Sequence, residues 1–279
     1  MQRAKELKLK AMLISSGILA ALAGLGWVGL QVRPAPFPAV GQPPSPLERI
    51  PLPAGLPAPV ERFYRQIYGE NISVITSAVI SGRGTMRLSG LTFPVRFRIT
   101  HQAGQGYRHY FETTFFGLPV MKVNETYVDG QTRMELPFGV IENEPKVDQA
   151  ANLALWAESL VWLPAILVTD PRLRWQPVDE TTALLIVPFG EAEERFVVRF
   201  DPESGLPRLV EAMRYRNPDS PAKTLWLSEA RQWARLNGPV IGAVASLTWL
   251  DEGTPWAVFK VEEALYNVAV EISPEKKGL

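Results

Sequence analysis

The chain has 279 residues, of which 29 are basic, 29 are acidic and 46% are apolar, so its formal net charge is zero. A neutral chain lacks the surplus of Lys and Arg that phosphate binding requires, which argues against nucleic acid as a partner. The chain has no Cys and only two His, which excludes disulfides, thiolate metal sites and a lipidated amino-terminal Cys, and disfavours catalytic triads.

The amino-terminal segment predicts a membrane anchor. Residues 1–10 are basic, and residues 11–30 follow without a charged side chain. Twenty helical residues span about 30 Å, the thickness of the hydrocarbon core of a bilayer. The positive charges before this span predict a cytoplasmic segment over 1–10, a single-pass anchor over 11–31 in the cell membrane, and an extracytoplasmic remainder. A cleaved signal peptide is the alternative, although its apolar region is normally about 7–15 residues long.

A proline-rich segment follows the anchor, with ten prolines between positions 34 and 59. Such a segment cannot donate enough backbone hydrogen bonds to form a sheet, and it favours polyproline II. About 26 residues at 3.1 Å each would let the domain stand as far as about 80 Å from the membrane. We therefore predict a disordered linker over residues 32–55.

The remaining sequence predicts an extracytoplasmic domain over residues 56–271, followed by a tail over 272–279. Residues 56–69 carry apolar side chains at helical spacing after Pro59, which indicates a short helix. After it the apolar residues recur at every second position, which indicates a hairpin with one apolar and one polar face. The apolar face carries Phe93, Val95, Phe97, Ile99 and His101, then Tyr107, His109, Phe111, Thr113 and Phe115.

The alternating pattern continues along the chain. Asp129 and Gly130 form a favoured two-residue hairpin turn. Further strands are expected between 181 and 216, at 223–236, at 243–250 and at 256–270. Their connections are too short for parallel crossovers, so neighbouring strands should be antiparallel. The predicted fold class is α+β but mainly antiparallel β, a curved sheet or half-barrel of about ten strands.

One substantial helix interrupts the strands. It should begin near Pro145 and must end before Pro164. Because it is apolar on nearly all sides, it must be covered on nearly all sides. Its charged first turn and its length make it a poor membrane span. We expect it to cover the concave face of the sheet as a lid or plug.

Several segments resemble an uncharacterised bacterial family, a domain of unknown function. The likeness covers about residues 54–270 and rests on LPAPVERFYRQ, GLPVMKVNETYVDGQTRMEL, the helix with Glu158, Trp162 and Pro164, LRWQPVD and RFDPESGLP. The strand order is also similar to the LolA-type periplasmic lipoprotein-carrier fold, a half-barrel with an apolar concave side closed by helices. The carrier resemblance implies an apolar ligand, whereas the family implies no catalytic residues.

Glu158 is the sharpest candidate for a functional group. A carboxylate desolvated beside Trp162 would have a raised pKa, suited to a general acid or to contact with a polar headgroup. The structural alternatives are that it caps a backbone donor or pairs with an arginine such as Arg133 or Arg172, because a buried charge without a partner is too costly to persist.

His101 and His109 continue the apolar register on either side of a turn, which predicts edge histidines near the mouth of a cavity. A metal would need a third ligand that the local sequence does not offer, so neither a metal nor another cofactor is predicted. The domain's tryptophans either form stacking platforms for sugars or pack in the core. Trp226 and Trp233 fall on opposite faces of their strand, which favours the core.

The leading prediction is a membrane-tethered binding protein for a lipid or another hydrophobic small molecule. One alternative is an accessory subunit of a larger membrane-protein complex, with its cavity filled by its own side chains. A weaker alternative is a cell-envelope hydrolase that acts through Glu158. The predicted ligand-binding residues are Glu158, Trp162, Trp156, Phe97, Phe111, Phe196, His101 and His109.

Overall fold

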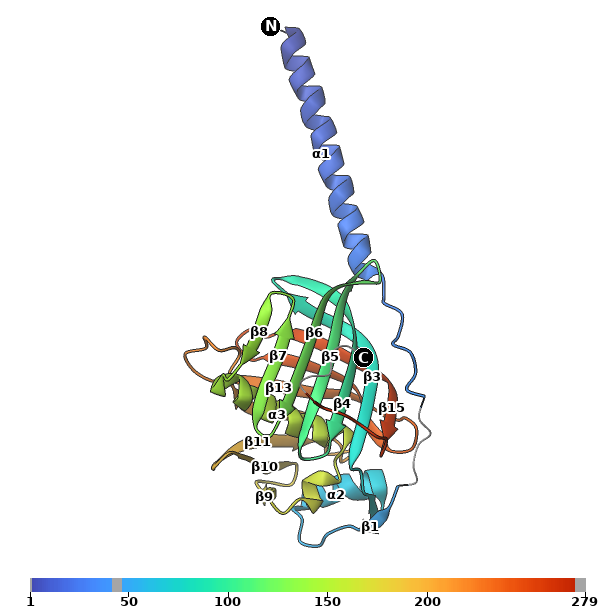
Figure 1. Ribbon diagram of the computed structural model, residues 1–279, viewed down its shortest axis with the longest axis vertical. Helices are drawn as coiled ribbons and strands as arrows, with labels where there is room; N and C mark the ends of the chain where they lie inside the picture. The colour runs from blue at the N-terminus through green and yellow to red at the C-terminus, as the bar shows by residue number, and fades with distance from the viewer. Residues whose placement is uncertain (1, 42–46, 274–279) are drawn as a thin grey trace.

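The computed structural model describes residues 2–41 and 47–273, which are dominated by one curved antiparallel sheet (Figure 1). Within these residues the sheet has thirteen strands in the order β8-β7-β6-β5-β4-β3-β15-β14-β13-β12-β11-β10-β9. The strands are β3 Ser77–Leu88, β4 Leu91–Gln102, β5 Gly106–Phe115, β6 Leu118–Val128, β7 Gln131–Leu136, β8 Gly139–Glu142, β9 Arg174–Pro177, β10 Thr182–Phe189, β11 Ala192–Phe200, β12 Pro207–Arg214, β13 Thr224–Arg235, β14 Val240–Trp249 and β15 Pro255–Tyr266.

The predicted fold class, a curved and mainly antiparallel sheet, is confirmed. The strand count of about ten was too low because β8 and β9 are short and β3 carries glycines in place of an apolar pattern. A Cβ added at Gly82 or Gly84 of β3 would lie 2.1 or 2.0 Å from a backbone oxygen of β15. These glycines therefore allow the close approach of β3 and β15 that lets the sheet curl.

Tight two-residue turns join β3 to β4, β5 to β6 and β6 to β7. The predicted turn at Asp129–Gly130 is present, with φ values of 52° and 81°. The same pair of positive φ angles occurs at Ser89–Gly90 and at Phe116–Gly117. This turn type matches the right-handed twist of the flanking strands, so it fixes the register of each hairpin.

Helix α3, Pro145–Trp162, lies on the concave side of the sheet and has the predicted boundaries (Figure 1). Helix α2, Ala58–Tyr68, and the short α4, Ile166–Thr169, contribute to the same core. The strands β1, Arg49–Pro51, and β2, Asn71–Ser73, form a separate small sheet.

Polar contacts hold α3 to the loop between β12 and β13 near its start and to β14 at its end. Lys146 Nζ donates to the backbone oxygens of Pro218 and Ser220 at 3.0 and 2.9 Å. Trp162 Nε1 donates to the backbone oxygen of Gly242 at 3.1 Å. A helix held at both ends is a fixed plug, so the lid option is not favoured.

Helix α1, Gln2–Gln31, projects away from the domain (Figure 1). Its segment Lys8–Gln31 has a mean hydropathy of 1.9 and exposed side chains, and among the described helices it alone is long and apolar enough to cross a membrane. Its carboxyl end touches the domain, because the backbone N–H of Phe116 donates to the oxygen of Gly29 at 2.9 Å.

The predicted disordered linker packs on the sheet over its first part. Phe37 is only 7% exposed. The centroid of its ring lies 5.7 Å from that of Tyr110, and the Arg96 guanidinium lies 4.5 Å above the centroid of the Phe37 ring. The backbone oxygens of this segment accept hydrogen bonds from arginines on the convex face, in the pairs Pro34–Arg83, Ala35–Arg96 and Pro38–Arg98.

The domain also begins earlier than predicted, since β1 lies inside the expected linker and Leu47 packs against the core. Residues 42–46 of that linker and 274–279 of the predicted tail lie outside the described residues.

Candidate functional site

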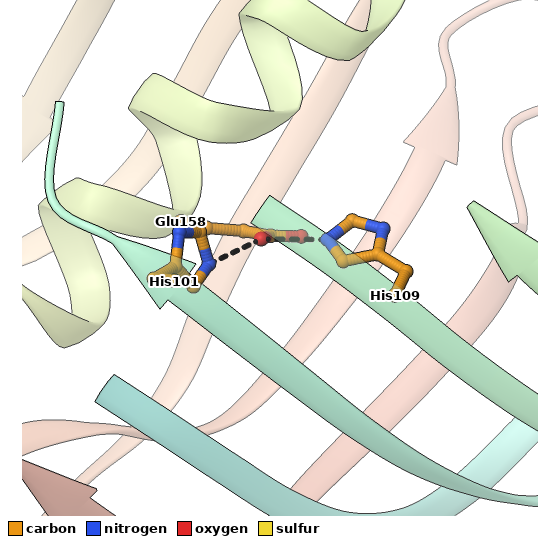
Figure 2. A group of neighbouring side chains, drawn as sticks. All are labelled: His101, His109 and Glu158. Carbon is orange, nitrogen blue, oxygen red and sulfur yellow. Dashed lines mark hydrogen bonds and ion pairs between the residues drawn. The ribbon is translucent and has the colours of Figure 1, made fainter. Parts of the chain in front are cut away.

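Figure 2 shows Glu158 of α3 reaching between His101 of β4 and His109 of β5. The Nε2 atoms of His101 and His109 lie 2.8 and 2.9 Å from the same oxygen, Oε2 of Glu158. The strand register explains this convergence: Ile99 faces His109 and His101 faces Tyr107, so the histidines are diagonal neighbours on the concave face. We call His101, His109 and Glu158 the His–Glu cluster.

The cluster corrects two predictions. Glu158 pairs with neither of the predicted arginines, because Arg133 pairs with Glu142 and Arg172 pairs with Asp170. The histidines are not edge residues, since the side chains of His101 and His109 are 0% and 7% exposed. The third group that the local sequence did not offer is Glu158 itself, 57 residues after His101. Ligand atoms of the three residues lie within 4.8 Å of one another.

A second carboxylate lies behind His109. Glu125 Oε2 is 4.0 Å from His109 Nδ1, and Glu125 accepts a hydrogen bond from the hydroxyl of Tyr107. The Tyr107 and His109 rings stack with their centroids 3.9 Å apart. His101 Nδ1 is enclosed and has no hydrogen-bond partner among the described residues.

The electrostatics of the cluster are opposite to those expected for a general acid. Burial alone would raise the pKa of Glu158, but the charge of His109 and the hydrogen bonds from both histidines lower it to about 2. Burial alone would lower the pKa of His109, but Glu158 and then Glu125 raise it above the ordinary 6.5. Glu158 is therefore ionised at neutral pH, which contradicts the predicted raised pKa and removes the basis for acid catalysis.

An apolar cavity of about 430 Å³ lies between α3 and the sheet, beside the cluster. Four of the predicted binding residues line it, namely His109, Phe111, Glu158 and Trp162. The other predicted residues lie elsewhere: Trp156, Phe97 and Phe196 are fully buried in the core, and His101 is behind His109 and Glu158. Much of the remaining wall comes from Met86, Leu88, Met121, Met134, Leu136, Trp226, Leu247, Trp256 and Phe259.

Sequence reasoning missed Arg214, which also lines the cavity. Its guanidinium lies 4.9 Å from the ring centroid of Trp226, and its Nε is enclosed without a hydrogen-bond partner among the described residues. Desolvation lowers the pKa of Arg214, while Tyr107, Glu125 and Glu158 act in the opposite direction. The alternation of Val210, Ala212 and Arg214 along β12 was the signal that could have placed this side chain inside.

The prediction that Trp226 and Trp233 fall on opposite faces of their strand is wrong because β13 is irregular. Its register with β14 shifts between Ala230 and Gln232 and again between Gln232 and Trp233. Such bulges reverse the facing of the residues that follow. Both tryptophans consequently contact the same core, in agreement with core packing rather than a sugar platform.

A family model described as "Family of unknown function (DUF6544)" matches residues 47–261. The chain belongs to the DUF6544 family. This confirms the resemblance noted in the sequence. No curated protein matches the chain.

Solved structures resemble the DUF6544 domain in overall arrangement. A LolA superfamily protein from Nitrosomonas europaea is 8% identical with a TM-score of 0.45, over 77% of this chain and 96% of that chain. A putative outer membrane lipoprotein-sorting protein domain from Vibrio parahaemolyticus is 9% identical with a TM-score of 0.42, over 76% and 91%. A DUF1329 family protein from Desulfovibrio piger is 12% identical with a TM-score of 0.42, over 71% and 88%. Likenesses this distant do not identify a ligand.

Proposed function

We propose that the protein binds a lipid or another apolar molecule in the cavity beneath α3, while α1 anchors it in the cell membrane with the domain outside the cell. The cavity carries this proposal. Its volume is about 430 Å³. A volume in the lower part of the usual range of about 300–1,000 Å³ suits one acyl chain or a compact apolar molecule.

The end of the sheet next to α1 supports a position at the membrane surface. Antiparallel strands place the β3–β4, β5–β6 and β7–β8 turns at the same end, and the β5–β6 turn contacts α1. Large apolar side chains are exposed there. We call this group the apolar rim: Leu91, Phe116, Leu118, Val120, Phe138 and Val140. A concentration of exposed apolar side chains beside a membrane-crossing helix fits insertion into the headgroup region of the bilayer.

The rim also offers a route into the cavity. Met86, Leu88 and Leu136 line the cavity, are half-buried and lie at the strand ends that meet the rim. Since α3 is held by hydrogen bonds near both of its ends, entry past these residues requires less rearrangement than displacement of the helix. A ligand that leaves the bilayer through this route would meet His109, Glu125, Glu158 and Arg214, which offer polar contacts to its headgroup.

Photo-crosslinking from a lipid bilayer tests this proposal. The full chain is reconstituted into vesicles that contain a phospholipid and a fatty acid, each with a diazirine in its acyl chain, and the irradiated protein is mapped by peptide mass spectrometry. We expect adducts on cavity residues such as Met121 and Met134 in addition to those on α1. The α1 adducts are an internal control for reconstitution.

A matched pair of variants separates the cavity from the rest of the domain. Ala245 lines the cavity, whereas its neighbour Val244 pairs with the exposed Lys260 on the opposite face of β14. Ala245→Phe should fill the cavity and remove the cavity adducts, and Val244→Phe should keep them. Adducts confined to α1 in the unmodified chain would refute the proposal.

A further inference from the structure

Three side chains from three separate elements direct nitrogen or oxygen atoms to one point in the His–Glu cluster. The Nε2 atoms of His101 and His109 lie 2.8 and 2.9 Å from Glu158 Oε2. Ligands in a tetrahedral site with metal–ligand bonds of about 2.0–2.1 Å stand about 3.3 Å apart. Movements of roughly half an ångström in these side chains would therefore open a position for an ion.

The contacts of His109 restrict what can lie at that position. Its Nδ1 faces the Glu125 carboxylate at 4.0 Å, and its Nε2 faces the Glu158 carboxylate at 2.9 Å. A neutral imidazole with its proton on Nδ1 would direct the lone pair of Nε2 at an anionic oxygen. Either a proton on Nε2 or a metal ion must therefore lie between His109 Nε2 and Glu158.

We propose that this position binds one divalent transition-metal ion through Nε2 of His101, Nε2 of His109 and a carboxylate oxygen of Glu158. Two imidazoles and one carboxylate are a ligand set of Zn²⁺ and Fe²⁺ sites, whereas Mg²⁺ and Ca²⁺ prefer oxygen ligands alone. The ion takes the place of the proton on each Nε2; a neutral imidazole keeps that proton by carrying it on Nδ1, so protons are released only where an imidazole carried two.

The residues around His109 fit this role, whereas His101 Nδ1 has no hydrogen-bond partner among the described residues. A metal-bound imidazole usually donates its other N–H to a carboxylate, and Glu125 lies in that direction from His109 Nδ1. Glu125 is itself held by the Tyr107 hydroxyl. Because His109 and Glu158 also line the cavity, a further coordination position faces the cavity and can take water or a polar group of a ligand.

A cobalt titration of the full chain tests the site. The chain is purified in non-ionic detergent without a polyhistidine tag, treated with a chelator, and titrated with Co²⁺ and then with competing Zn²⁺. We expect one Co²⁺ per chain, visible d–d absorption bands of a four- or five-coordinate ion, and their loss when Zn²⁺ displaces it. Since the chain has two His and no Cys, imidazole ligation must come from His101 and His109.

Variants assign the ligands. Glu158→Gln and His109→Gln should each weaken Zn²⁺ binding at least 100-fold, and Glu125→Gln should weaken it about 10- to 100-fold. The control is Glu112→Gln, which removes a buried carboxylate on the convex face of the same strand, β5, and should leave the affinity unchanged. Equal Zn²⁺ affinity in the unmodified chain and in Glu158→Gln would overturn the proposal.

A second readout avoids dependence on the folding of the variants. In the unmodified chain, the imidazole proton resonances of both histidines should shift together and stop shifting at one Zn²⁺ per chain. Failure of the two to shift together, or a shift that never saturates, would contradict a shared ion. Absence of metal binding would leave the cavity crosslinks unaffected, so this proposal and the proposed lipid binding can fail separately.

Discussion

The two sides of α3 differ in how they meet the sheet. On one side, large side chains such as Leu153, Trp156 and Leu160 are at most 1% exposed and pack in the core that contains Phe196 and Val198. On the other side the helix presents Ala154, Ala157 and Glu158, and the cavity lies against them. One helix therefore completes a dense core on one side and leaves a space on the other.

This difference shows that the cavity results from side-chain size at a few helix positions. A close-packed interior normally has few voids larger than a water molecule. Alanines at the cavity-facing positions leave a volume that leucines would fill. The filled side supplies the stability that lets the other side remain open.

The largest effect should come from breaking the filled side. Trp156→Ala removes a side chain that is 1% exposed and that donates a hydrogen bond to Asn152. We expect a loss of about 3–5 kcal/mol in the free energy of unfolding, measured by urea denaturation followed by circular dichroism. A loss below about 1 kcal/mol would show that this side is not close-packed.

One substitution placed on each side sharpens the comparison. Ala151 lies in the filled core, and Ala154, one turn later, lines the cavity. Ala151→Leu should destabilise the protein by about 1–3 kcal/mol through overpacking, while Ala154→Leu should change the stability by less than about 1 kcal/mol. Equal losses in thermal or urea unfolding would contradict a pre-formed space beside Ala154.

Acid should weaken the strands beside the cavity, because it protonates Glu112, a buried carboxylate on the convex face of β5. Burial raises the pKa of Glu112, but hydrogen bonds from Tyr110 and Arg96 and the charge of Arg96 outweigh it and bring the pKa below 4.5. A lowered folded-state pKa stabilises the protein above the unfolded-state pKa, and this contribution disappears as pH falls through the folded-state pKa.

Glu112→Gln should therefore cost about 1–2 kcal/mol at pH 7, with a smaller difference from the unmodified chain at pH 3. Urea midpoints at a series of pH values measure this, with the exposed Glu203→Gln as the control. Hydrogen exchange should show β5 and β6 losing protection in acid before β10 and β11 do. A pH-independent difference would contradict the assignment.

The smallest expected effect concerns the packed linker. Arg98 donates to the backbone oxygen of Pro38 and lies 5.5 Å from the ring centroid of Phe37. Arg98→Gln should cost about 0.5–1 kcal/mol and should increase hydrogen exchange over residues 33–41, with exchange in α3 unchanged. Faster exchange throughout the domain would mean that the linker is part of the core.

Local signals in the sequence were sufficient for much of the fold. Pro145 and Pro164 predict the limits of α3, and Asp129–Gly130 predicts its hairpin turn, because these residues act on the adjacent backbone. The bulges near Trp233 have no such signal and reverse a face assignment made by counting.

The candidate site was only partly predictable because it joins residues that are far apart in the sequence. Glu158, His101 and His109 could each be singled out by type, but their convergence depends on how α3 crosses the sheet. An arginine was expected to pair with Glu158 because a buried charge needs a partner, and two imidazoles occupy that place instead.

The contact between residues 32–41 and the convex face has a consequence for ligand exchange. A flexible tether would let the domain move far from α1, whereas the contacts of Phe37 with arginines of the convex face, and of Gly29 with Phe116, hold the domain beside the end of α1. Under the proposed function, any donor or acceptor of the ligand would therefore have to come to the membrane surface to exchange it.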